Sequence, residues 1–89
     1  MLNIKISNTY KRDLKKFRHN KKVLDISTKI VGDLKNGVPL AAKLRDHALS
    51  GNWAGFRECH LQPDCLLVYR IDLGELLLAR IGSHSEIFG

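Results

Sequence analysis

The sequence predicts an α+β domain in which two helices pack on one face of an antiparallel sheet, in the order β-α-α-β-β-β. Apolar residues recur at helical spacing between Tyr10 and Leu34, and they alternate or form short runs before and after that stretch. Turn signals separate the last three apolar runs, as in a meander of hairpins. The 89 residues, 44% hydrophobic and 27% charged, are expected to form one domain covering 1–89.

The first predicted element is a strand, because apolar and polar residues alternate over Leu2–Ile6. A helix is expected next, since Ser7, Asn8 and Thr9 each offer a side-chain oxygen to the free amides of a first helical turn. Its apolar face recurs at i, i+4 and i+7, with Tyr10, Leu14 and Phe17. We expect His19-Asn20 to end this helix.

A second helix is predicted from apolar residues at helical spacing, namely Val23, Ile26, Ile30, Val31 and Leu34. Gly37 is well placed to end it in the left-handed conformation. Because the turn between the helices is short, we expect them to pack as an antiparallel pair. Residues 41–53 are interpreted as a connector with a possible helical turn and a turn signal at Ser50–Asn52.

Three strands are predicted in the remainder, at about Gly55–Leu61, Cys65–Ile71 and Glu75–Ile81. Gln62–Asp64 joins the first two, with proline where no ladder donor is needed, and Asp72–Gly74 makes a tight hairpin between the last two.

Strand parity places His60 on one face of its strand with Phe56 and Glu58. The opposite face carries Cys59 and Leu61. If Cys59, Leu61, Leu77 and Ile81 pack under the helices, His60 and Arg80 both project from the uncovered face of the sheet.

The net charge of +6 is unevenly distributed. Through Arg45 there are 12 Lys or Arg residues against three acids, whereas from Asp46 onward three arginines face six acids. A parallel cationic stripe is expected beside the apolar face of the first helix, formed by Lys11, Lys15, Arg18 and Lys22. A basic scaffold of this kind suits a polyanionic substrate such as a nucleic acid, although an acidic protein would also find it attractive.

Three of the four histidines lie in the last half of the chain, at His47, His60 and His84, together with Asp64 and Arg80. Metal-free RNA cleavage needs a base for the 2′-hydroxyl, an acid for the leaving 5′-oxygen and a cation for the phosphorane charge. These residue types can supply all three. The alternative interpretation is that none of these residues has a chemical role. The histidines are then ordinary loop and strand residues, Asp64 is a turn residue, and Arg80 forms a surface salt bridge.

Neither a metal nor a cofactor is expected. No pair of histidines or cysteines has the spacing typical of a zinc site. Cys59 and Cys65 are interpreted as two small buried hydrophobes rather than as a disulfide, since a cytoplasmic location is the default. No apolar run approaches the ~20 residues of a membrane span, and Met1–Ile6 has no signal-peptide pattern.

The carboxy-terminal half resembles the RelE/ParE superfamily of bacterial toxins, and specifically its YafQ-type branch. The residues that carry the resemblance are Asp46, His47, Leu49, Gly51, Trp53, Gly55, Phe56, Arg57, His60, Pro63, Asp64, Leu67, Tyr69, Arg80, Gly82, His84, Phe88 and Gly89. The resemblance implies a RelE-like microbial RNase fold and an mRNA endonuclease of a type II toxin–antitoxin system. Such an enzyme acts in the ribosomal A site by metal-independent attack of the 2′-hydroxyl, and it inhibits translation.

The resemblance also implies site residues and partners. The expected catalytic residues are His47, His60, Asp64, Arg80 and His84, with His84 the first choice for proton transfer. Substrate contacts are expected from Phe88, Arg57 and the cationic stripe. The implied partners are a cognate antitoxin, the ribosome with its mRNA, and operator DNA for the toxin–antitoxin complex. Cys65 stands where some relatives have a bulky aromatic, so codon preference can differ.

Two other functions fit the same fold. A ParE-like toxin inhibits DNA gyrase by protein contact, and a non-catalytic basic module binds nucleic acid. Neither function requires histidines, an acid and an arginine for proton transfer and charge stabilisation. The presence of these residues therefore favours the nuclease.

Overall fold

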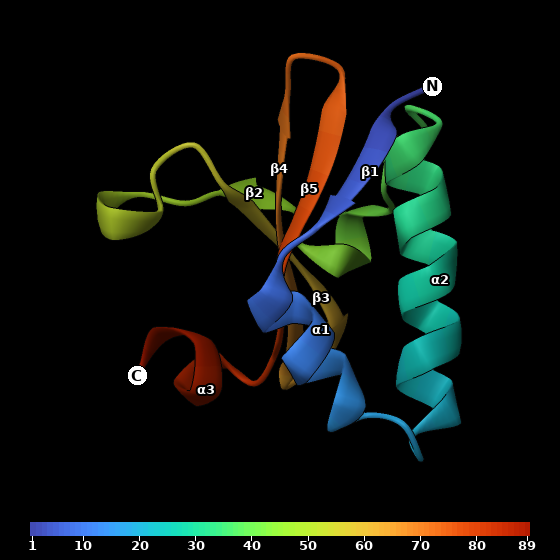
Figure 1. The fold of residues 1–89 in the computed structure, drawn as a ribbon, viewed down its shortest axis with the longest axis vertical. Helices are drawn as coiled ribbons and strands as arrows, with labels where there is room; N and C mark the ends of the chain where they lie inside the picture. Colours follow the sequence, from blue (N-terminus) through green and yellow to red (C-terminus); the bar gives the residue numbers. More distant parts are fainter.

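The computed structural model describes residues 1–89 and contains a five-stranded mixed sheet in the order β1-β5-β4-β3-β2. Its strands are β1 (Asn3–Ile6), β2 (His47–Ala48), β3 (Arg57–Gln62), β4 (Cys65–Asp72) and β5 (Glu75–Gly82). Its helices are α1 (Asn8–Lys15), α2 (Lys21–Lys35) and α3 (His84–Phe88), with 3₁₀ turns η1 (Ala42–Leu44) and η2 (Gly51–Trp53). Figure 1 views the sheet nearly edge-on, with α2 on one side and α3 on the other.

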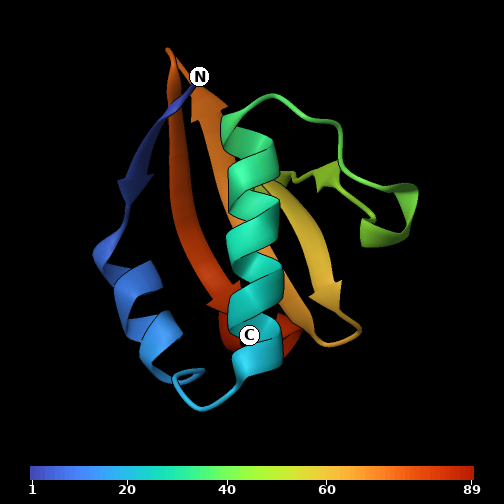
Figure 2. The ribbon, with the colours of Figure 1, turned by 90° about the vertical axis from the view of Figure 1, so that its right-hand side faces the viewer.

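The predicted α+β class and the meander of the last three strands are confirmed, with strand ends shifted by one or two residues. The expectation of a wholly antiparallel sheet is wrong, because β1 pairs with β5 in parallel. After the helices the chain re-enters the sheet with the short strand β2, and β3 then runs in the same sense as β1 (Figure 2). Strand β2 and helix α3 were not predicted.

Helix α1 begins where the sequence indicated, since the Ser7 side chain accepts a hydrogen bond from the Tyr10 N–H at 3.0 Å. It ends at Lys15, earlier than expected, and turns lead to Asn20, whose side chain caps α2. The cationic stripe therefore does not follow one helix face, because Arg18 lies in the turn and Lys22 on α2. Gly37 has a φ of +72°, as predicted for a left-handed terminator.

The larger core lies between the sheet and the helices α1 and α2. The helices contribute four fully buried side chains, Tyr10, Val23, Ile30 and Leu34. The sheet contributes Cys59, Leu61, Cys65, Leu67, Tyr69, Leu76, Leu78 and Ile81. Both cysteines are free, and burial raises the pKa of the Cys59 thiol to about 12 and that of Cys65 to about 11. They behave as the small buried hydrophobes that the sequence indicated.

The opposite face of the sheet is covered, so the prediction that His60 and Arg80 project from an uncovered face is wrong. A smaller core there consists of Leu66, Val68, Ala79 and Ile87, with Leu49, Trp53, Phe56 and Phe88 packed against it. The segment before β3 and helix α3 supply this cover (Figure 1). We call this side of the sheet the α3 face.

A β-bulge changes the side-chain parity of β5. Val68 pairs with Arg80 and Tyr69 with Leu78, so Ala79 is the extra residue. Leu76 and Leu78 therefore face the helices with Ile81, and Leu77 does not, contrary to the simple alternation. Arg80 pairs with Val68 of the α3 face, but its side chain reaches Asp13 on α1, so the expectation that it projects away from the helices is wrong.

The β4–β5 hairpin turns through Leu73 and Gly74, with φ of +49° and +77°. Two consecutive positive φ values are typical of the type I′ turn that matches the twist of a hairpin. Leu73 is 93% exposed and has no packing role. None of the helices has the length and apolar character needed to cross a membrane.

Candidate active site

The sheet brings His47 and His60 to the α3 face from two neighbouring strands. His47 on β2 pairs with Glu58 on β3, and Glu58 pairs with Val68 on β4. Two residues further along β3, His60 pairs with Leu66, which in turn pairs with Gly82 at the end of β5. Since strands lie about 4.8 Å apart, His60 and Gly82 are separated by about 10 Å. His84 follows two residues after Gly82, so three histidines lie around one part of this face.

Glu58 is the residue that connects His47 and His60. Its Oε1 lies 2.9 Å from Nε2 of His47 and 3.9 Å from Nε2 of His60, and the second distance is too long for a hydrogen bond. The Glu58 side chain is only 7% exposed, and its Oε2 is buried without a hydrogen-bond partner. Buried carboxylate oxygens without a donor are uncommon and concentrate at functional sites.

Both ring nitrogens of His47 lie at hydrogen-bond distance from oxygen atoms. Its Nδ1 lies 2.7 Å from the carbonyl oxygen of Arg45, and its Nε2 lies 2.9 Å from the Glu58 carboxyl group. These two contacts orient the imidazole ring beside the site. A histidine held in this way suits proton transfer as a general acid or base.

The residue before His47 anchors its strand to the sheet. The Asp46 carboxylate accepts hydrogen bonds from the Tyr69 hydroxyl at 2.5 Å and from Nε and Nη2 of Arg57 at 3.3 Å each. The hydrogen bond to Asp46 raises the pKa of Arg57 above its ordinary value. Arg57, which we expected to contact substrate, is thus already paired, and its contact with Asp46 holds β2 in place.

Arg80, the expected source of positive charge for the transition state, is also paired. Its Nε and Nη2 donate to the two oxygens of Asp13 on α1, at 2.8 and 3.2 Å. The same carboxylate accepts from the Ile81 backbone N–H at 3.1 Å. Asp13 is 3% exposed, and its hydrogen bond raises the pKa of Arg80. This pair ties α1 to β5 and engages much of the guanidinium.

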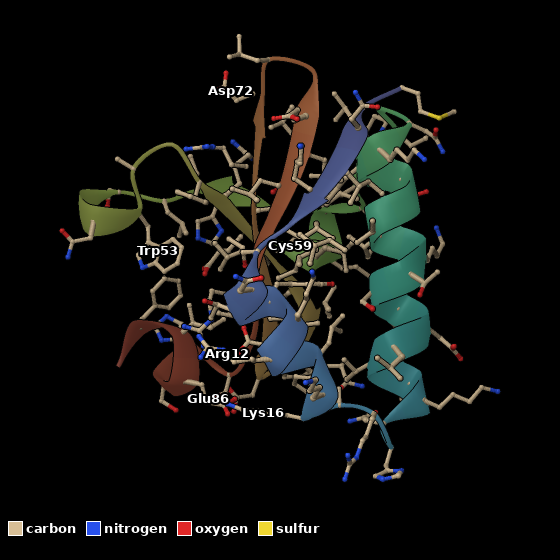
Figure 3. All side chains as sticks on the ribbon, viewed as in Figure 1. Arg12, Lys16, Trp53, Cys59, Asp72 and Glu86 are labelled. Atoms are coloured by element: carbon tan, nitrogen blue, oxygen red, sulfur yellow. The ribbon has the colours of Figure 1, made fainter.

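Helix α3 presents His84 and Phe88 one turn apart, with ring centroids separated by 4.9 Å. Phe88 also meets Trp53 edge to face at 5.9 Å, and the side chain of Trp53, the last residue of η2, points toward α3 (Figure 3). Ser83 and Glu86 form a capping box that starts the helix. The backbone and side chain of Ser83 lower the pKa of Glu86, which also pairs with Lys16 at 3.4 Å (Figure 3).

The other predicted site residues are exposed. Asp64 lies in the β3–β4 turn and makes no side-chain hydrogen bond or ion pair. The four cations of the predicted stripe are exposed and form no ion pair: Lys11, Lys15, Arg18 and Lys22. No group of three or more His, Cys, Asp or Glu side chains is arranged to hold a metal ion.

Sequence reasoning missed Glu58 and Asp13 as residues of the site. The signal for Glu58 was present, because it shares strand parity with His60 two positions later. Asp13 is the only acidic residue among the first 24, in a segment otherwise rich in lysine and arginine. Its partner, 67 positions away in the chain, had no local signal.

Comparisons with known proteins were made for the sequence and for the fold. Residues 2–89 match the family described as the bacterial toxin of type II toxin-antitoxin system, YafQ. The mRNA interferase toxin YafQ of Escherichia coli K12 is 39% identical over 56 residues, which are 63% of this chain and 61% of that protein. The alignment thus spans less than two thirds of the curated relative.

Solved structures match over nearly the whole chain. A metal-bound toxin from Helicobacter pylori is 48% identical with a TM-score of 0.90, and the match covers 99% of this chain and 100% of that one. In a DinJ–YafQ complex from E. coli, the matching chain is 30% identical with a TM-score of 0.88, and both chains are covered completely.

Proposed function

The chain belongs to the YafQ family of bacterial toxins of type II toxin–antitoxin systems, and from this premise we propose that it is an mRNA endoribonuclease that inhibits translation. The observation that carries the proposal is the group His47–Glu58–His60 on the α3 face, with His84 at the start of α3, two residues after the end of β5. The name of the E. coli relative, an mRNA interferase toxin, supports the same reaction.

The proposed reaction is attack of a ribose 2′-oxygen on the adjacent phosphorus. The O2′–P bond forms and the P–O5′ bond breaks, which leaves a 2′,3′-cyclic phosphate and a 5′-hydroxyl. A base must remove the 2′-hydroxyl proton, and an acid must protonate the departing 5′-oxygen. His47, whose ring is oriented by the Arg45 carbonyl and the Glu58 carboxyl group, suits the acid. His84, exposed at the start of α3, suits the base, with His60 and Asp64 next to the substrate path.

The shape of the site favours a substrate that is held by something else. The α3 face is filled by a small apolar core, so its histidines lie at a shallow surface rather than in a deep pocket. Such a surface cannot orient a flexible RNA by itself, whereas the ribosome presents mRNA already extended in the A site. The exposed cations Lys11, Lys15, Arg18 and Lys22 are then docking contacts for ribosomal RNA.

A cognate antitoxin is part of the proposal, together with a cytoplasmic location. The solved complex of the E. coli relative with DinJ supports a protein partner of this class. With a net charge of +6, the toxin suits a partner with acidic side chains that covers the histidines. The toxin–antitoxin pair is expected to bind operator DNA.

The test is cleavage of mRNA on programmed 70S ribosomes by the wild type and by His84→Ala and His47→Ala, beside the same RNA without ribosomes. Loss of a general acid or base should slow the cleavage step by about 10²–10⁴-fold. A matched variant, His19→Ala, removes an exposed histidine in the α1–α2 turn and should leave cleavage unchanged.

The outcomes separate the competing functions. Cleavage that needs the ribosome and both histidines is the expected result. Cleavage of free RNA would support the nuclease function and show that the ribosome is not required for it. Growth arrest with gyrase-dependent DNA breaks and no RNA cleavage would instead assign a gyrase inhibitor. RNA binding with no cleavage under any condition would assign a non-catalytic module.

A further inference from the structure

A groove of about 470 Å³ opens at the edge of β3, beside His60. Strand β2 pairs only with the first two residues of β3, so the rest of that edge is not covered by a strand. The wall opposite β3 is η1 with the residue that follows it. The lining residues are Lys43, Leu44, Arg45, His60, Leu61, Gln62 and Pro63.

The charge of this groove differs from that of the other two principal hollows. A hollow beside α2 contains Asp25 and Asp33 with Lys29 and Lys43, and a third, near the β4–β5 turn, contains Asp72 and Glu75 with Lys5 and Arg70. The groove beside His60 contains two cations, Lys43 and Arg45, and no acid. Of the three, it is therefore the one whose lining suits a polyanion without carboxylate repulsion.

Lys43 and Arg45 are also free to bind a ligand. Both side chains are exposed, and neither forms an ion pair within 4 Å. In contrast, Arg57 is paired with Asp46 and Arg80 with Asp13. The two arginines that the sequence predicted near the reaction are thus engaged, whereas Lys43 and Arg45 border the histidine group in the groove without an acidic partner.

Arg45 links the groove to the reacting histidines through its backbone. It takes the left-handed conformation, with a φ of +52°, directly after η1. Its carbonyl oxygen then faces Nδ1 of His47 at 2.7 Å, while the residue also lines the groove. At the other end, His60 is both a wall of the groove and a neighbour of Glu58. A chain lying in the groove would therefore run directly into the histidine group.

We propose that this groove binds the sugar–phosphate backbone of single-stranded RNA next to the cleaved bond, with Lys43 and Arg45 as phosphate contacts. The inference rests on the proposed function, because it names where that substrate lies. Gln62 offers an amide that can hydrogen-bond a ribose hydroxyl or a base edge. Two phosphate contacts are expected to contribute about 25-fold to RNA affinity at 0.1 M salt, with a slope of log K against log salt of about −1.4.

The test uses the full chain and a fluorescent oligoribonucleotide that is 2′-O-methylated throughout, so that it binds without being cleaved. Affinity is measured by anisotropy over a range of salt concentrations for the wild type and for Lys43→Gln/Arg45→Gln. The control is Lys21→Gln/Lys35→Gln, which removes the same charge from α2 and lies outside the groove. Cleavage on programmed ribosomes is measured in parallel.

The expected result is that the groove variant loses about 25-fold in affinity at 0.1 M salt and about 1.4 in slope, while the control variant loses much less. Equal losses in the two variants would overturn the proposal, since net charge alone would then explain binding. Failure of the wild type to bind the oligonucleotide would overturn it as well. If the groove variant loses binding but no variant ever cleaves RNA, the groove stands and the proposed nuclease function fails.

Discussion

Replacing Arg80 by methionine should destabilise the protein mainly through the acid that it leaves behind. Asp13 is 3% exposed and would keep a single hydrogen bond, from the Ile81 N–H. Breaking a buried pair by removing one partner costs about 3–5 kcal/mol. Because the Arg80 side chain is 21% exposed, we expect about 3 kcal/mol.

That loss is large for a protein of this size. An 89-residue domain is stabilised by roughly 4–13 kcal/mol, and a loss of 3 kcal/mol lowers the melting temperature by about 12–24 °C. Trp53 is the only tryptophan, so its fluorescence in a urea titration measures the unfolding free energy.

The double variant Asp13→Asn/Arg80→Met tests whether the unpaired buried charge of Asp13 causes the loss of stability. Asparagine keeps an oxygen for the Ile81 N–H and carries no charge, so the second substitution should restore about 1.5–2 kcal/mol of the loss. A double variant no more stable than Arg80→Met alone would refute the argument from the buried charge. If stability returns and RNA cleavage does not, Arg80 also serves the reaction.

Four further outcomes are expected. Leu73→Asn should raise the unfolding free energy by about 0.5–1 kcal/mol in a urea titration, because asparagine tolerates the left-handed turn; Leu73→Ile should lower it. Tyr69→Phe removes a donor to Asp46 and should cost about 1–3 kcal/mol and slow cleavage, so unchanged stability and rate would exclude the anchoring role. Ser83→Ala should cost about 1 kcal/mol and change Trp53 fluorescence as α3 frays; an unchanged spectrum would argue against it. Since the pKa of Glu86 is lowered, the capping contribution should be full above pH ~4.5 and fall as the pH drops further, in urea titrations at several pH values.

Most of the fold follows from local sequence signals. Gln62–Asp64 and Asp72–Gly74 mark the two turns of the meander, and Gly37 marks the end of α2, because each turn needs a particular backbone chemistry. Strand β2 has two residues, too few to show any periodicity. Helix α3 is only five residues long, and the capping-box spacing of Ser83 and Glu86 was not used in the prediction.

The parts that could not be predicted depend on contacts between distant residues. The bulge at Ala79 reverses the side-chain parity of β5 without any local signal in the sequence. The sequence therefore predicted that Leu77 packs under the helices, whereas Leu76 does. The histidines of the candidate site were selected from their residue types, and strand parity placed His60 on the sheet face opposite the larger core, where it lies in the structure. The pairing of Arg80 with Asp13, which changes how Arg80 is interpreted, depends on α1 lying against the end of β5.

The parallel pairing of β1 with β5 also has a consequence for how the protein is made. Asn3 pairs with Glu75, so the first strand has no partner until 72 further residues have been synthesised. At 5–20 residues per second, that interval is roughly 4–14 s. During it, Ile4 and Ile6 on β1 cannot pair with Leu76 and Leu78 on β5, because the second half does not yet exist. Closure of this sheet is thus a late, long-range step, and His84 joins His47 and His60 only after synthesis has passed Gly82.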